Sequence, residues 1–210
     1  MDAAYDLIWE YSYGAVTIDA ICERAAVKKG SFYYFFESKS DLAITAIEAW
    51  WTKRQIIMLE IFRADSPPLE RIRSYMDFIS THQIQSYEKK GYVPGCPLHA
   101  LGAEICTQDQ QIRSQLEGIL DTITTFFAQA IGDAQALGQI EGAQTAQKAR
   151  ALMAYYAGVL TQARIRNNIE SLRSLGSDSL DLLGAHPPAK SVPPLPSMPA
   201  EPRAQLVPSL

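Results

Sequence analysis

The stretch that decides the fold is Thr17-Ile18-Asp19-Ala20-Ile21-Cys22-Glu23-Arg24-Ala25-Ala26-Val27-Lys28-Lys29-Gly30-Ser31-Phe32-Tyr33-Tyr34-Phe35-Phe36. Thr17 is a typical N-cap, because its hydroxyl can accept from the free backbone N–H groups of a first helical turn. Apolar residues then recur at helical spacing on both sides of a small-residue break. The side chains expected to face inward are Ile18, Ile21, Ala25, Phe32 and Phe36. The pattern predicts two short helices around a tight turn, which is a helix-turn-helix.

The second helix of this pair carries a polar face suited to double-stranded DNA. Lysines can neutralise phosphates, and hydroxyl groups can bond to phosphates or to base edges in a major groove. Another interpretation is open: the lysines form an ordinary solvated face, and the tyrosines are partly core. The candidate DNA-contacting residues are Thr17, Lys28, Lys29, Gly30, Ser31, Tyr33, Tyr34 and Lys39.

Residues 25–42 resemble the recognition helix of the TetR family of transcriptional regulators and the start of the long helix that follows it. The resemblance implies an all-α homodimer that binds a palindromic operator and responds to a small molecule. It implies phosphate contacts for Thr17, Tyr33 and Lys39. It also implies that Lys28, Lys29, Ser31 and Tyr34 approach bases or backbone.

Two features depart from the family pattern. Ala26 stands where the family often has glycine, and Phe35 stands where a histidine is common, so one phosphate donor is lost. Residues 1–45 also carry more acidic than basic side chains, although DNA-binding domains are usually basic. We therefore expect weak non-specific DNA binding. The basic residues are Arg24, Lys28, Lys29 and Lys39, and the acidic ones are Asp2, Asp6, Glu10, Asp19, Glu23, Glu37 and Asp41.

The rest of the chain also has helical periodicity and few strand signals, so we expect an all-α protein of about nine helices. Three parts are predicted: a helix-turn-helix domain over 1–45, a ligand-binding and dimerisation domain over 46–184, and a proline-rich tail over 185–210 that is expected to be disordered. The later helices are predicted over 97–106, 108–131, 143–166 and 168–182.

The larger domain has two features that suggest a ligand site. Aromatic and methionine side chains on two long helices could enclose a cavity, although core packing explains most such residues. Cys96 precedes Pro97, which places the thiol at a helix N-cap, where the helix dipole favours the thiolate. A similar element occurs in TetR-type regulators that respond to electrophiles or oxidants, but a lone cysteine is more often a buried apolar residue. The candidate ligand-binding residues are Trp50, Trp51, Met58, Tyr75, Phe78, Cys96 and His99.

Apolar residues on the last two predicted helices indicate a dimer interface. Two such hairpins from two subunits would form a four-helix bundle, as a palindromic operator requires. The candidate interface residues are Leu152, Tyr156, Leu160, Ile169 and Leu172.

Composition narrows the function further. The chain has 210 residues, 47% apolar content, a formal charge of −4, three cysteines without paired spacing, and no run of eighteen apolar residues. We expect a cytoplasmic protein without a metal, cofactor or membrane partner. Two alternatives are a thiol enzyme using Cys96 and His99, which lacks an orienting acid, and a helical adaptor that no longer binds DNA. We expect a regulator rather than an enzyme.

Overall fold

The computed structural model describes residues 2–186, and within that range the chain forms ten helices and no named strand. The all-α prediction is confirmed. The helices are α1 (Asp2–Glu10), α2 (Ile18–Arg24), α3 (Lys29–Phe35), α4 (Lys39–Ile61), α5 (Pro68–Lys90), α6 (Pro97–Ile105), α7 (Gln110–Ala136), α8 (Thr145–Arg166), α9 (Glu170–Arg173) and α10 (Leu175–Leu182).

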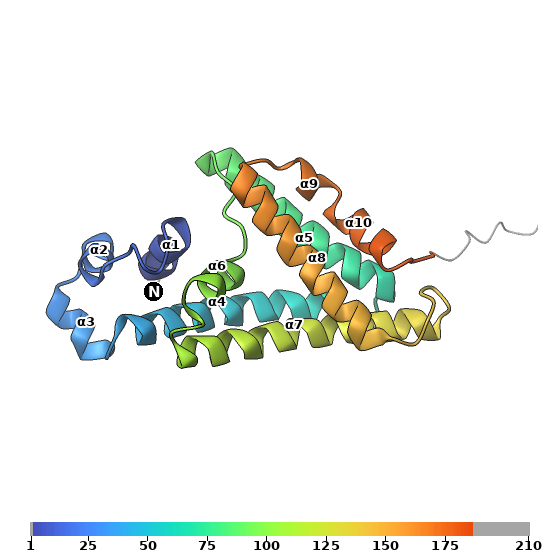
Figure 1. Ribbon diagram of the computed structural model, residues 1–210, viewed down its shortest axis with the longest axis horizontal. Coiled ribbons are helices and arrows are strands. Elements are labelled where there is room, and N and C mark those ends of the chain that lie inside the picture. The colour runs from blue at the N-terminus through green and yellow to red at the C-terminus, as the bar shows by residue number, and fades with distance from the viewer. Residues whose placement is uncertain (1, 187–210) are drawn as a thin grey trace, which may run out of the picture.

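Helices α1, α2 and α3 form a small unit at one end of the molecule (Figure 1). Its core joins α1, α2, α3 and the first turn of α4, so the helix-turn-helix is packed on both of its neighbours. Ile21 and Phe32 are buried, and Ile18 and Phe36 pack partly buried against them, as predicted. Ala25 is exposed rather than inward, because it caps the C-terminus of α2 at the turn. The core residues are Ala4, Leu7, Val16, Ile21, Cys22, Phe32 and Leu42.

The larger unit is built on four long helices. Figure 1 shows α4 and α7 running side by side along one edge, with α5 and α8 crossing above them and α6 filling the corner next to α1. Tyr75 and Phe127 meet at its centre, with their rings 5.5 Å apart. Leu42 belongs to the small core and Ala43 to the large one, so α4 joins both units as one continuous helix.

Local chemistry explains where the long helices begin and end. Pro68 and Pro97 occupy the first positions of α5 and α6, where a missing N–H costs nothing. Helix α5 ends at Gly91 with φ of 78°, and α8 ends at Asn167 with φ of 46°, both in the left-handed conformation that closes helices. Among residues 2–186, no helix is both long and apolar enough to span a bilayer.

The C-terminal region differs from its predicted form. A single helix was expected over 168–182, but the chain breaks at Ser174 into α9 and α10, which makes ten helices rather than nine. Helix α10 lies against α5, where a Cβ at Gly176 would collide with Asp77, so glycine permits this close approach. The first residues of the predicted tail are ordered, since the N–H of His186 donates to the Gln139 carbonyl at 2.8 Å. The prolines of the tail, in 187–210, lie outside the described residues.

Candidate DNA interface and effector domain

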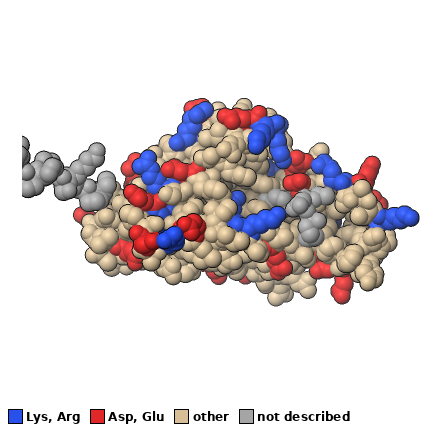
Figure 2. All heavy atoms as spheres, turned by 180° about the vertical axis from the view of Figure 1, so that it is seen from behind, with Lys and Arg blue, Asp and Glu red and all other residues tan. Residues whose placement is uncertain are grey.

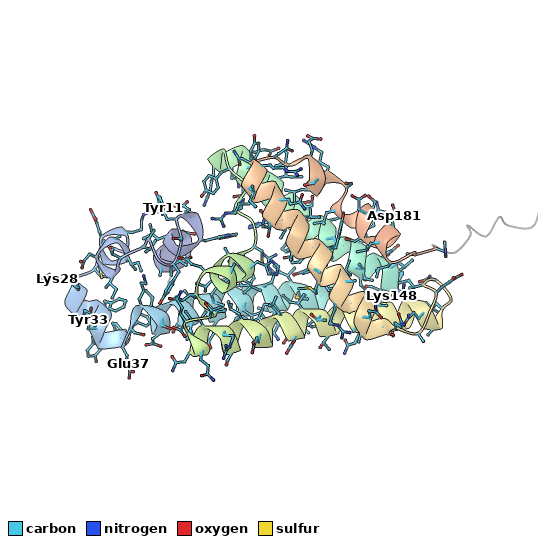
Figure 3. The ribbon with its side chains drawn as sticks, viewed as in Figure 1. Tyr11, Lys28, Tyr33, Glu37, Lys148 and Asp181 are labelled. Atoms are coloured by element: carbon cyan, nitrogen blue, oxygen red, sulfur yellow. The ribbon has the colours of Figure 1, made fainter. Side chains whose placement is uncertain are left out.

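The recognition helix α3 presents most of its candidate residues to solvent. Figure 3 shows Lys28 and Tyr33 at the end of the molecule opposite Lys148 and Asp181. Tyr34 is 82% exposed, far more than a tyrosine in a protein core, and Ser31 is exposed beside it. A Cβ at Gly30 would meet nothing within 4 Å, so this position leaves the surface of α3 open. Exposed hydroxyl and ammonium groups on one helix are the donors that DNA recognition needs.

Two other candidates already have partners. The Thr17 hydroxyl accepts from the Ala20 N–H at 3.1 Å and caps α2, as predicted. The Nζ of Lys29 lies 2.8 Å from the Asp19 carboxylate, and this partner raises the pKa of Lys29. Both residues of the pair are exposed, so the pair is readily exchanged for a phosphate.

Lys39 bonds within the small unit. Its Nζ donates to the carbonyls of Tyr13 and Val16 at 2.8 and 2.9 Å, and lies 4.3 Å from the centre of the Tyr13 ring. These contacts tie the first turn of α4 to the loop before α2. The loop carbonyls there have no helical partner, and the ammonium group satisfies them. Lys39 therefore positions α4 against this loop, and its phosphate contact stays a prediction.

The turn of the motif carries conformational strain. Ala26 has φ of 53°, which is the left-handed region that glycine adopts without cost. Ala26 stands where the family often has glycine, and this is the position at which the turn requires the left-handed conformation. The N–H of Val27 bonds to the Cys22 carbonyl at 2.9 Å and holds the turn closed.

Charge on the molecular surface is mixed. Figure 2 shows basic and acidic side chains interspersed on the face opposite to that of Figure 1, with no large field of one sign. The positive charge offered to DNA is therefore local to α3, as the overall charge of −4 requires.

In the larger unit, Cys96 and His99 lie in a buried aromatic setting at the start of α6. The His99 ring is 6.0 Å from that of Tyr156, which is 6.4 Å from that of Tyr75. Burial raises the pKa of Cys96, but the adjacent His99 imidazole and backbone N–H groups outweigh it, so the net shift is downward. Burial lowers the pKa of His99, and the thiolate outweighs that effect, so its net shift is upward. The two neighbouring side chains therefore shift each other's pKa values in opposite directions, that of Cys96 downward and that of His99 upward.

The other predicted ligand residues fall into two groups. Trp50 and Phe78 line an open hollow of about 580 Å³ between α4 and α5. Met58 and Tyr75 are instead fully buried in the main core, and burial raises the pKa of Tyr75 to about 12. Trp51 packs half-buried against that core, with its ring 6.4 Å from that of Trp50. The expected single aromatic cavity is therefore divided, because Met58 and Tyr75 fill the space between the helices.

Residues that sequence reasoning did not select connect α6 and α8 to the DNA-binding unit. Glu104 of α6 accepts from the N–H groups of Tyr13 and Gly14, in the loop between α1 and α2. Arg164 of α8 donates to the carbonyls of Trp9 and Pro94 at 3.2 and 2.9 Å. Each bond joins residues at least 70 positions apart, so local patterns carried no signal for them.

The burial of the predicted dimer residues shows that their assignment to a subunit interface was wrong. Leu152, Leu160 and Leu172 are at most 1% exposed and Tyr156 is 5% exposed, so they pack within their own protomer; Ile169 is half-buried against the same core. The apolar stripe was read correctly as a buried face, but it faces α7, α9 and α10 of its own protomer, and Tyr156 also packs on Tyr75 of α5. On the opposite face of α8, Ala154, Thr161 and Ile165 are exposed and Gly158 is half-buried.

An exposed recognition helix, a helix-turn-helix core and a separate helical domain define a DNA-binding transcriptional regulator. Residues 1–46 match the family model described as bacterial regulatory proteins, tetR family, and residues 68–175 match that of the tetracyclin repressor-like C-terminal domain. The chain belongs to the TetR family. The function expected from the resemblance is confirmed at this level.

Three similar proteins illustrate the relationship. The transcriptional regulator AcuR of Cereibacter sphaeroides is 28% identical over 82% of this chain and 78% of its own. The regulator UidR of Escherichia coli is 30% identical over 76% of this chain and 77% of its own. The reduced form of E. coli NemR superposes with a TM-score of 0.76 at 20% identity, covering 90% of this chain and 96% of that one.

Proposed function

We propose that the protein is a homodimeric repressor that leaves a palindromic operator when a small molecule binds its larger domain, and that Cys96 is the group with which an electrophilic effector would react. The observation that carries the proposal is the position of α6. One end of this helix holds Cys96 and His99, and Glu104 near its other end holds the loop before α2.

Helix α6 is short enough to act as a rigid link between the two units. It has nine residues, which corresponds to roughly 13 Å at the rise of an α-helix. A displacement at Cys96 is therefore passed to Glu104 without being absorbed. Because Glu104 bonds to Tyr13 and Gly14, the displacement reorients α1 and α2, and α2 packs on the recognition helix α3.

A change in orientation releases DNA only through a dimer. Two recognition helices must match half-sites that are one helical turn apart, roughly 34–36 Å, so a small tilt in each subunit changes their spacing. An effector acts by binding more tightly to the unmatched spacing than to the matched one. The family supports dimeric assembly, and we assign the interface to the face of α8 that includes Gly158 and Ile165.

Repression rather than activation is supported by relatives. NemR of E. coli, 22% identical over 80% of this chain, is a transcriptional repressor. The small-molecule part of the proposal rests on the lowered pKa of the Cys96 thiol beside His99 and on the hollow between α4 and α5.

The test is operator release by a panel of quinones and aldehydes, measured by gel shift with the DNA upstream of the gene. The parent protein should release its operator, and Cys96→Ser should bind it equally well but resist release. Cys106→Ser is the matched control, because the pKa of Cys106 is raised by burial and by Glu117, and its thiol is less reactive. Equal release from the parent and Cys96→Ser would remove Cys96 from the mechanism. Absence of operator binding would contradict the proposed function itself.

A further inference from the structure

The hollow between α4 and α5 contains a buried cation without a partner. Arg54 projects from α4, is 9% exposed, and contributes to the wall of the hollow. Its Nη1 is shielded from solvent and has no hydrogen-bond partner among the described residues. A buried charge without a counterion is costly, so such an arrangement is uncommon unless another molecule supplies the counterion.

Aromatic rings hold the Arg54 guanidinium in place without neutralising it. Its central carbon lies 4.8 Å from the centre of the Phe78 ring and 5.4 Å from that of Trp50. Cation–π contacts of this kind orient a guanidinium but satisfy none of its N–H donors. The hollow is therefore walled by flat apolar surfaces, and a donor group lies between them.

The side chains that line the hollow carry more positive than negative charge. Lys53, Arg54, Lys89 and Lys90 line the hollow, and Asp6 is the acidic residue among its lining side chains. Lys90 also lies 3.3 Å from Glu10, outside that lining. The pKa of His82, which lines the hollow as well, is lowered by burial and by Arg54, Lys89 and Lys90, so that imidazole is held neutral. Electrostatic focusing in such a hollow favours anions.

The hollow is also connected to the buried site at α6. The guanidinium of Arg54 is close enough to Tyr75 and Tyr156 to oppose the rise in their pKa values that burial causes. Tyr156 in turn contacts His99, with the two rings 6.0 Å apart. A ligand anion that neutralises Arg54 would therefore remove this opposing effect on Tyr75 and Tyr156.

We propose that this hollow binds an organic anion, with its carboxylate on Arg54 and an aromatic or other flat apolar body against the apolar wall that includes Trp50, Ile57 and Phe78. Arginine suits this task because its planar N–H groups match the two oxygens of a carboxylate. The volume of about 580 Å³ is in the range of small-molecule sites. The role of such an anion as an effector rests on the proposed function. Its binding to the hollow does not, since binding requires no DNA.

The test compares two ligands of the same shape with and without charge: 2-naphthoate and 2-naphthamide, titrated calorimetrically into the full-length protein. The naphthoate should bind at least about tenfold more tightly, as expected for a charge-assisted bond. Arg54→Met should abolish that preference, whereas Arg73→Met on α5 should keep it, because Arg73 is exposed and outside the hollow. If the parent protein binds 2-naphthoate and 2-naphthamide with equal affinity, that result alone would overturn the proposal.

A melting curve provides a second readout. Arg54→Met should raise the melting temperature of the ligand-free protein, because it removes a buried charge that lacks a partner and keeps the apolar stem. A marked fall would contradict the proposal, since it would mean that Arg54 has a structural partner. Gel shifts with and without naphthoate separate the two hypotheses. If the protein binds its operator but not naphthoate, the repressor function stands and the anion site is rejected. If it binds naphthoate but not the operator, the anion site stands and the repressor function is rejected.

Discussion

The recognition helix and the larger domain keep their functional side chains in opposite settings. On α3, Tyr34 and Ser31 are exposed and come from one short segment. In the larger domain, Cys96 is buried and Arg54 nearly so, and their neighbours come from other helices. A DNA-contacting surface can be formed by residues that are close together in the sequence. An enclosed site needs residues that only the folded chain brings together. This difference determines which substitutions should damage stability and which should damage binding.

The largest contrast is expected on the two faces of α8. Leu160→Glu places a charge in the core and should destabilise the fold by about 3–5 kcal/mol. Ile165→Glu, at a side chain that is 78% exposed, should retain the helical spectrum but sediment as a monomer. Circular dichroism and analytical ultracentrifugation measure both. A dimeric Ile165→Glu would place the interface elsewhere.

On the recognition helix, binding should change without a change in fold. Lys29→Ala should reduce the slope of log affinity against log salt by about one, because it removes one phosphate-neutralising cation. Tyr33→Phe should weaken operator binding by about 1 kcal/mol, the value of one hydrogen bond. Arg173→Ala, an exposed residue of α9, is the control and should bind as the parent does. An unchanged salt slope in Lys29→Ala would indicate that its pair with Asp19 persists on DNA.

In the larger domain, the first measurable effect should be chemical. The pKa of Cys96 is lower in the folded chain than its ordinary value, so ultraviolet thiolate absorbance should appear at lower pH in the native protein than in the urea-unfolded one. Subtracting the titration of Cys96→Ser isolates this thiol. His99→Gln should move the titration to higher pH, because the cation beside the thiolate is lost. Coincident native and unfolded curves would contradict the pairing of Cys96 with His99.

The smallest effect is expected at the turn of the motif. Ala26→Gly relieves a left-handed alanine, worth about 1–2 kcal/mol, but the unfolded glycine gains conformational freedom worth about 0.5–1 kcal/mol. The net stabilisation should be below about 1.5 kcal/mol by these values, measured by urea unfolding. Operator affinity should not change, since Ala26 precedes the face formed by Ser31 and Tyr34.

The difference between the two regions also explains what the sequence could predict. The helix-turn-helix follows from the spacing of Ile18, Ile21, Phe32 and Phe36, and the same pattern predicts which side of α3 is exposed. Periodicity marked the stripe through Leu160 as buried but could not say what buries it, because that depends on where α7, α9 and α10 pass.

The bonds of single polar groups were beyond sequence reasoning. Lys39 bonds to two loop carbonyls, which its expected phosphate contact did not indicate, and Glu104 bonds to a loop 90 positions away. Arg54 gave no local signal, since its setting depends on Phe78 of the neighbouring helix. Partners of this kind are fixed by tertiary packing, which a linear pattern does not encode.

Two copies of α3 in a dimer should read one palindrome, and footprinting of the DNA upstream of the gene can show this. We expect two protected half-sites about one helical turn apart, and Tyr33→Phe should need about fivefold more protein than the parent for the same protection, which corresponds to about 1 kcal/mol. Protection of a single site, or of no site at low salt, would contradict this expectation.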